Sequence, residues 1–258
     1  MIETQNCVVS YLFMIFNLIK KFVFPSRCVI CDNVLPFGNK LENEHLCDNC
    51  KSKLEFIKDP TCKKCGASIS NEEDKFCMRC KEKFSKNFEY GFGLFRYNDS
   101  IKQSLHRVKY VGRKEYLYFY GKLIARAFYK KFLEINPDCL IPVPIHKTRL
   151  KARNFNQSFI LAETISKELL NMGIDIPVNT NIVFRNKNTK VLNKLDNDDR
   201  KLELNNAFTI NKVFGIDKVL IIDDIYTTGS TINEIAKCLK NAGINKIYFS
   251  VISVLDNL

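Results

Sequence analysis

The chain lacks both of the glycine-rich signatures that bind nucleoside triphosphates and dinucleotides. Neither G-x-x-x-x-G-K-[ST] nor G-x-G-x-x-G occurs in its 258 residues, which include only ten glycines. A triphosphate site and a dinucleotide site of these types therefore lose support. The sequence also lacks a secretory signal with a small-residue cleavage site, and this favours a cytoplasmic protein.

A long, purely apolar run is lacking as well. The most apolar stretch, residues 8–24, is 17 residues long and contains one asparagine and two lysines. It is short and polar for a membrane span, so we expect no transmembrane segment. Its apolar residues share one helical face, which predicts a packed helix over residues 1–25 or, alternatively, a membrane-surface helix.

Cysteine, by contrast, is abundant. Eight of the eleven cysteines form four C-x-x-C pairs. Two such pairs can wrap four thiolates around one zinc ion, so the sequence predicts two structural zinc sites. Redox thiols are the alternative, but a thioredoxin-like pair does not come in fours. The simplest pairing gives a first set, Cys28, Cys31, Cys47 and Cys50, and a second set, Cys62, Cys65, Cys77 and Cys80. Gly66, directly after the third pair, suits a knuckle turn with a positive φ.

Positive charge is concentrated in one segment. The net charge is +12, and residues 96–153 hold fourteen Lys or Arg against four Asp or Glu. Such an excess indicates an anionic partner. The alternative is a solvated helix face, and the spacing of Lys122, Arg126 and Lys130 fits it.

From about residue 90 onward, short apolar strands alternate with amphipathic helices. This pattern predicts an α/β domain with a mostly parallel sheet that is covered on both faces. We expect an N-terminal helix over 1–25, a cysteine-rich region over 26–88 and the α/β domain over 89–258. The expected helices are 114–134, 156–171 and 231–241, and the expected strands are 139–143, 181–184, 218–222 and 246–254. The polar run 185–206 predicts a functional or mobile loop.

The stretch VLIIDDIYTTGST, residues 219–231, combines an acidic pair with a turn suited to phosphate. Amides of a turn that leads into a helix form an anion site, and the threonine and serine hydroxyls add donors. The acceptor-only oxygens of Asp223 and Asp224 suit a vicinal diol or hydrated Mg²⁺. Phosphate at one end and a diol at the other describe a ribose 5-phosphate. The alternative reading is simple turn and helix capping.

This stretch closely resembles the phosphoribosyl pyrophosphate (PRPP) signature of type I phosphoribosyltransferases. Upstream, IPVPIHKTRLKARNFNQSFILAETI (141–165) and LHRVKYVGRKEY (105–116) resemble segments of the ComF competence-protein family, as does the double zinc ribbon. The resemblance covers nearly the whole chain. It implies a Rossmann-like type I phosphoribosyltransferase fold behind a zinc ribbon, and a role in natural DNA uptake.

The resemblance also implies roles for individual residues. Asp223 and Asp224 would hold the ribose hydroxyls, with Mg²⁺ accompanying PRPP, and the 5-phosphate would lie among Thr227, Thr228, Gly229, Ser230 and Thr231. Positive partners of the pyrophosphate would be Arg149, Lys151 and Arg153. Three positions depart from the family pattern, namely Asn154, Leu192 and Glu203. They place turnover in question more than PRPP binding.

Three functions are compatible with these features. One is transfer of a phosphoribosyl group to an acceptor, for which Tyr226 is a candidate proton-transfer residue. The second is binding of single-stranded DNA, by basic and aromatic residues, without catalysis. The third is PRPP sensing. The candidate DNA-contacting residues are Lys109, Arg113, Lys122, Arg126 and Lys130. Further expected partners are DNA-uptake proteins at the inner face of the membrane.

Overall fold

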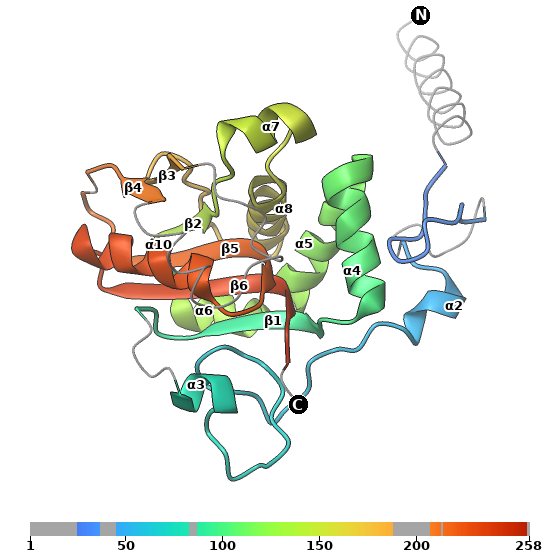
Figure 1. Ribbon diagram of the computed structural model, residues 1–258, viewed down its shortest axis with the longest axis horizontal. Helices are drawn as coiled ribbons and strands as arrows, with labels where there is room; N and C mark the ends of the chain where they lie inside the picture. Colours follow the sequence, from blue (N-terminus) through green and yellow to red (C-terminus); the bar gives the residue numbers. More distant parts are fainter. Residues whose placement is uncertain (1–24, 37–44, 83–86, 188–206, 213, 257–258) are drawn as a thin grey trace, which may run out of the picture. The chain divides into compact units, whose positions relative to one another are not determined.

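The structure is a computed structural model that describes residues 25–36, 45–82, 87–187, 207–212 and 214–256 (Figure 1). The chain divides into two compact units, Met1–Lys53 and Leu54–Leu258, so the boundary falls between the two cysteine sets. The helix expected over residues 1–25 lies outside the described residues, apart from Pro25. Within the described ranges, every helix is too short or too polar to cross a membrane.

Both cysteine sets share one local structure. In each, the first C-x-x-C pair lies in a turn closed by an antiparallel bridge, Arg27↔Val34 in one unit and Thr61↔Ser68 in the other. The residue after that pair has a positive φ, 65° at Asp32 and 74° at Gly66, as the sequence predicts for Gly66. The second pair of each set lies at a short helix, α2 (Asp48–Lys51) or α3 (Met78–Glu82).

The second unit is built on a parallel sheet of four strands. Its order is β1-β6-β5-β2, and each neighbouring pair runs parallel. A separate antiparallel pair, β3 with β4, precedes β5 in the chain. The predicted α/β domain with a mostly parallel sheet is therefore confirmed. The strands are β1 (Gly91–Arg96), β2 (Cys139–Pro142), β3 (Val183–Arg185), β4 (Phe208–Ile210), β5 (Lys218–Tyr226) and β6 (Lys246–Val254).

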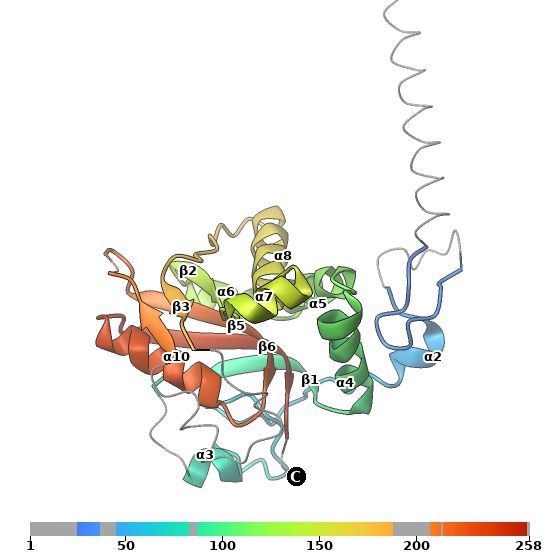
Figure 2. The ribbon, with the colours of Figure 1, turned by 45° about the horizontal axis from the view of Figure 1, so that its top comes forward.

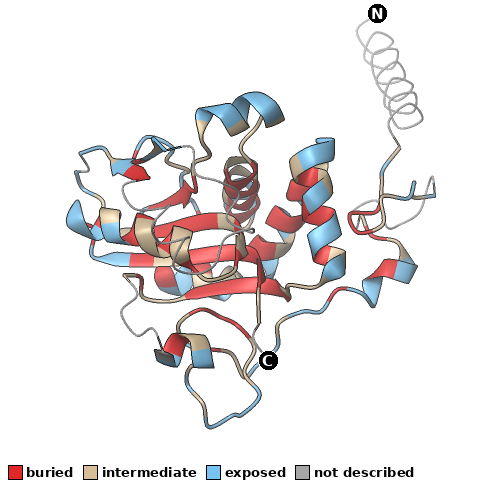
Figure 3. Cartoon of the chain, in the orientation of Figure 1, coloured by how far each residue is buried: buried red, intermediate tan, exposed pale blue. Residues whose placement is uncertain are grey.

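Helices cover the sheet on both faces. Alternate residues of β5 point to opposite faces. Val219 and Ile221 join the core cluster that includes α10 (Ser230–Asn241), the β3–β4 pair and the second cysteine set. The opposite face is covered by α5 (Glu115–Ala127) and α8 (Gln157–Asn171), which pack on each other. Figures 1 and 2 show α8 and α10 on opposite sides of the sheet, and Figure 3 shows the buried strands between them.

The structure differs from the sequence-based expectation in several elements. The helix expected over 114–134 is two helices, α5 and α6 (Tyr129–Ile135), separated by Phe128 with φ −110° and ψ 19°. Lys122 and Lys130 therefore do not lie on one continuous helix. Strand β5 extends past residue 222 to Tyr226 because its pairing with β6 continues there. Strands β1 and β4 and three helical segments were not expected. The helical segments are α4 (Asp99–His106), the π-helix η2 (Arg107–Val111) and α7 (Lys147–Arg153).

The chain leaves two neighbouring strands toward opposite faces. After β2 it forms α7 and then α8 on one face, whereas after β5 it forms α10 on the other. In open α/β sheets, ligands bind in the crevice that such a divergence creates at the carboxyl ends of the strands. Asp223, Asp224 and the turn that follows them lie at this edge of the sheet.

Candidate functional site

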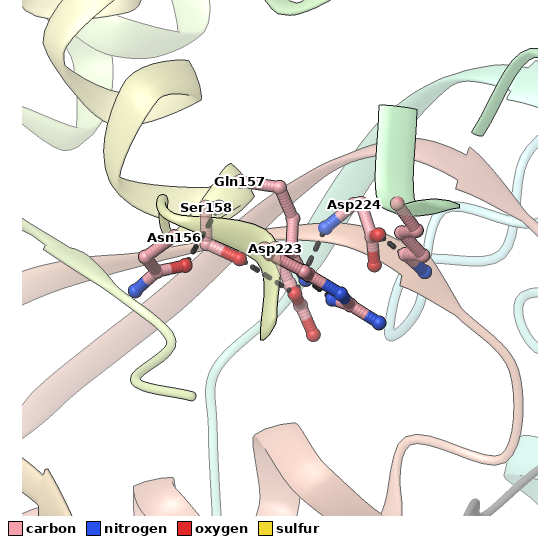
Figure 4. A network of polar contacts seen from close by, with 7 residues as sticks. Asn156, Gln157, Ser158, Asp223 and Asp224 are labelled. Atoms are coloured by element: carbon pink, nitrogen blue, oxygen red, sulfur yellow. Dashed lines mark hydrogen bonds and ion pairs between the residues drawn. The ribbon is translucent and has the colours of Figure 1, made fainter. Parts of the chain in front are cut away.

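The acidic pair at the end of β5 is held from two sides (Figure 4). The Ser158 hydroxyl donates to Asp223 Oδ1 at 2.9 Å, and the backbone N–H of Asp224 donates to the same oxygen at 2.9 Å. Lys109 Nζ lies 2.5 Å from Asp224 Oδ2. Asp224 is 6% exposed. Burial of this kind requires a charge partner, which Lys109 provides.

The start of α8 places Ser158 beside Asp223. Asn156 is the N-cap residue, and its side chain accepts the Ser158 N–H at 3.0 Å. The same side chain donates to the Val143 carbonyl at 3.0 Å, which fixes the helix start to the end of β2. Gln157, the first residue of α8, is buried and accepts from Arg153 at 3.1 Å. The segment Asn156–Ser158 therefore connects β2 to the acidic pair.

Lys109 reaches the acidic pair from the π-helix η2, which ends at Gly112 with φ 81°. Wide helical turns of this type re-aim side chains and occur often at functional sites. The Lys109 side chain is only 19% exposed. The sequence predicts Lys109 at a nucleic-acid surface, but its side chain instead points to Asp224.

Burial and charge repulsion perturb the titration of Asp223. Burial, followed by the neighbouring Asp224 charge, raises the pKa of Asp223 to about 7, against the opposing effects of Lys109 and the Ser158 hydrogen bond. One carboxyl thus takes up a proton near neutral pH while the other is paired with a lysine. The site is poised to accept a ligand with hydroxyl donors or positive charge.

The turn after the acidic pair forms an open pocket with an empty volume of about 300 Å³. Its lining runs from Asp223 to Ile232 and includes Thr227, Thr228, Gly229, Ser230 and Thr231. Thr228 Oγ1 and Ser230 Oγ lie 2.8 Å apart, at the first turn of α10. Helix N-termini attract anions through their amides and dipole, so the pocket suits a phosphate.

Gly229 and Tyr226 fit each other closely. Gly229 has φ 75°, and a Cβ at this position would lie 2.3 Å from Tyr226 Oη. Tyr226 is 1% exposed, and its ring stacks on Phe249 with centroids 4.7 Å apart. Burial raises the pKa of Tyr226 well above its usual value. Tyr226 therefore forms the floor of the loop, and its role as a proton-transfer residue stays a prediction.

Arg185 interacts electrostatically with Asp223 and Arg149, and Arg149 interacts with Arg153. Burial and then the charge of Arg149 lower the pKa of Arg185 to about 10, while Asp223 opposes that effect. Burial and then the charge of Arg153 lower the pKa of Arg149. Arg149 thus lies near both other arginines, whereas Lys151 is exposed on α7. A partly desolvated group of like charges is typical of an anion site.

The other candidate DNA-contacting residues are dispersed. Lys122 is exposed on α5, and Lys130 is exposed on the separate helix α6. Arg126 is paired with the buried Glu168 at 2.7 Å. Arg113 lies 3.7 Å from Glu115. The structure therefore leaves Lys122 and Lys130 as the more accessible charges of this group.

The paired cysteines form two four-thiol clusters with the predicted grouping. Within each set all four Sγ atoms lie within 4.8 Å of one another. The Cys31–Cys47 and Cys65–Cys77 Sγ distances are 3.8 and 3.7 Å. A tetrahedral zinc ion with Zn–S bonds of about 2.3 Å separates its sulfurs by about 3.8 Å. Both sets therefore fit a zinc ion with all four positions filled, which is the structural type of site.

Sequence reasoning missed three residues of this region. Ser158 contacts Asp223, and Arg185 lies near it. Arg79, between two cysteines of the second set, donates to the backbone carbonyl of Thr227. The predicted helix start at residue 156 is a sequence signal that Ser158 lies in the first turn of a helix. Arg185 matches the arginine of a ComF-family sequence pattern, which is a signal for it, whereas Arg79 depends on long-range packing.

Comparison with known proteins agrees with the cysteine pattern and with the overall order of motifs. The double zinc ribbon domain family matches residues 19–81. Competence protein F of Haemophilus influenzae is 28% identical over 236 residues, which are 87% of this chain and 95% of that protein. Competence protein ComFC of Bacillus subtilis is 28% identical over 207 residues, 78% of this chain and 80% of that protein. The resemblance to the ComF family is therefore confirmed.

Two further similar proteins extend the comparison. DNA utilization protein YhgH of Escherichia coli K12 is 26% identical over 223 residues, 85% of this chain and 92% of that protein. Among solved structures, a purine phosphoribosyltransferase from Pyrococcus horikoshii aligns with 50% of this chain and 69% of its own. That alignment has 19% identity and a TM-score of 0.31.

The two cysteine clusters predict two zinc ions per chain, measured by elemental analysis of protein purified without added metal. Cys77→Ser should reduce the content to one, because it removes a ligand of the second set. Cys238→Ser should retain both ions, since Cys238 belongs to neither set. Structural zinc contributes about 10–16 kcal/mol in small modules, so a chelator should unfold at least the first unit. Metal-free protein with unchanged folding would contradict the assignment.

The raised pKa of Asp223 predicts a pH-dependent stability. An unfolded aspartate has a pKa of about 3.9, so the folded protein binds the additional proton between that value and about pH 7. Stability from this group is present at low pH and is lost as the pH rises through about 7. Asp223→Asn, which retains an acceptor for Ser158, should raise the melting temperature by a few degrees at pH 8.5 and by less at pH 5.5.

Asp224→Asn is the matched control for this experiment. It removes the partner of Lys109 and should lower the melting temperature, because Lys109 then loses its ion pair. An Asp223→Asn shift that is the same at pH 5.5 and pH 8.5 would refute the proposed titration of Asp223.

Proposed function

We propose that this protein binds PRPP together with Mg²⁺ at the carboxyl end of β5. The observation that carries the proposal is the direct succession of an acidic pair near the end of β5 and an open pocket lined by the hydroxyl-rich turn that follows. The resemblance of VLIIDDIYTTGST to the PRPP signature supports the same ligand. The position at a divergence of neighbouring strands suits a nucleotide-like ligand as well.

Each part of PRPP has a complementary group in this arrangement. The 5-phosphate fits the Thr227–Thr231 turn, where hydroxyls and helix amides serve as donors. The ribose hydroxyls would donate to Asp223 and Asp224. The ion pair between Asp224 and Lys109 would weaken in part when the ribose binds. The pyrophosphate would face Arg149, Arg153 and Arg185, whose mutual repulsion its negative charge would relieve.

Such a site supports transfer of the 5-phosphoribosyl group. In that reaction the bond from C1 to the pyrophosphate oxygen breaks, and the pyrophosphate departs with the electron pair while an acceptor bonds to C1. Bound Mg²⁺ would neutralise pyrophosphate charge. The arginine cluster would stabilise the departing anion, and the acidic pair would hold the ribose while positive charge develops on it. Asn154, the C-cap residue of α7, has φ 62°, a left-handed conformation that glycine and asparagine tolerate.

Removal of the acidic pair tests this proposal. Asp223→Ala/Asp224→Ala should weaken binding of PRPP with Mg²⁺ at least about 100-fold, because two charge-assisted contacts to the ribose are lost. Calorimetric titration provides the measurement, and the far-UV spectrum should stay unchanged. The control, Glu134→Ala/Asp175→Ala, removes two exposed carboxylates elsewhere and should retain affinity. Equal affinity in both double variants would show that the acidic pair does not hold the ligand.

A second candidate function, binding of single-stranded DNA, has its own supporting observation. Tyr110 is 63% exposed, and its ring lies 4.7 Å from the His106 ring and 5.5 Å from the Arg153 guanidinium. An exposed ring flanked by cationic or aromatic groups is typical of platforms on which bases stack. The names of the relatives, competence and DNA utilization proteins, are compatible with this function.

Charge reversal tests DNA binding. Lys122→Glu/Lys130→Glu should weaken binding of an oligonucleotide and make its salt dependence shallower, by about 0.7 per lost phosphate contact. The control, Lys237→Glu/Lys246→Glu, makes the same charge change at exposed positions outside residues 96–153. Titrations at several salt concentrations give both quantities. If both pairs of reversals have the same effect, only net charge matters and the basic segment is not a specific surface.

A further inference from the structure

The second cysteine set has a side chain that contacts the phosphate loop. Arg79 lies between Cys77 and Cys80, within α3. Its Nη1 donates to the Thr227 carbonyl, and its Nη2 donates to the Leu255 carbonyl at 2.8 Å. We propose that Arg79 is a positioning residue for the loop 227–231, and that the metal of the second cysteine set holds the loop through Arg79. The effect on PRPP binding rests on the proposed function, whereas the restraint of the loop by Arg79 does not.

The conformation of Arg79 depends on the cysteines around it. Helix α3 has five residues, and the backbone N–H groups of Cys80 and Lys81 both donate to the Cys77 carbonyl at 2.9 Å. A single turn of helix is unstable without tertiary support. Ligation of Cys77 and Cys80 to one metal ion would supply that support, since it fixes both ends of the segment that carries Arg79.

The two carbonyls that accept from Arg79 belong to neighbouring strand ends. Thr227 directly follows β5, and Leu255 directly follows β6. The Leu255 N–H donates to the Tyr226 carbonyl at 2.8 Å, which closes the connection between the two ends. A guanidinium donates to two acceptors in a fixed fork, so it fixes the separation of the two segments. Arg79 therefore restrains the first peptide of the loop.

Packing gives a second connection between the cysteine set and the loop. Tyr226, the floor under Gly229, belongs to the same core cluster as Cys65, Cys80 and Phe88. The Phe88 and Tyr226 rings meet edge to face with centroids 6.4 Å apart. Displacement of the second cysteine set would thus disturb the floor of the loop as well as its first carbonyl.

The start of α10 is also tied to the segment after the cysteines. The side-chain oxygen of Asn233 accepts from the backbone N–H of Asn87 at 2.8 Å. The loop is therefore restrained at its beginning, through Thr227, and near its end, in the first turns of α10. The first cysteine set lies in the other compact unit, and it provides an internal comparison.

The experiment compares five variants with the wild type by amide hydrogen exchange and zinc content. Arg79→Ala should retain two zinc ions but exchange the amides of residues 228–231 about tenfold faster, because a charged hydrogen bond to the loop is lost. Arg79→Lys should restore part of the protection. Met78→Ala changes an exposed side chain of the same turn, 71% exposed, and should leave exchange unaltered. Cys77→Ser should lose one zinc ion and the loop protection together, whereas Cys31→Ser should lose one zinc ion only.

Binding of PRPP with Mg²⁺ provides the functional readout. Its affinity should fall about tenfold in Arg79→Ala and Cys77→Ser and stay unchanged in Met78→Ala and Cys31→Ser. Unaltered loop exchange in both Arg79→Ala and Cys77→Ser would overturn the inference, and so would equal effects of Cys31→Ser and Cys77→Ser. If the wild type does not bind PRPP, the proposed function fails, but the exchange data still decide whether the second cysteine set holds the loop.

Discussion

The buried carboxylate of Asp224, next to the half-buried Asp223 near the end of a central strand, is the constraint on which the rest of the site depends. The charge of Asp224 is paired with Lys109, and the carboxylate of Asp223 accepts hydrogen bonds from the Ser158 hydroxyl and a backbone N–H. These partners come from three different parts of the chain, so η2, the start of α8 and the end of β5 must meet. The cost of an isolated buried charge explains why each contact is present.

The acidic pair and the loop 227–231 that follows it have opposite electrostatic preferences. The carboxylates favour donors and cations, whereas the amides and hydroxyls at the start of α10 favour anions. A ligand satisfies both only if it carries its phosphate and its hydroxyls at separate ends. The arginine cluster formed by Arg149, Arg153 and Arg185 adds a second position that suits an anion. The PRPP proposal rests on this combination of features.

How far the sequence predicts this structure depends on how local each feature is. The grouping of the cysteines and the position of α10 follow from spacing and short-range pattern, and both are confirmed. The break at Phe128 was missed because the apolar period continues through it. Lys109 was assigned to a nucleic-acid surface because it is a basic residue beside Tyr110. Its contact with Asp224 could not be predicted, since it depends on the π-helix η2. Arg79 could not be assigned from sequence, since its acceptor is 148 residues away.

The central claim is that one ligand occupies both the phosphate loop and the arginine cluster. The most direct measurement is a ³¹P NMR titration of PRPP, in the presence of Mg²⁺, with the wild-type protein. The account predicts that the 5-phosphate resonance and the pyrophosphate resonances shift or broaden together. A change confined to the pyrophosphate resonances would show that the loop 227–231 binds no phosphate, and it would contradict the account.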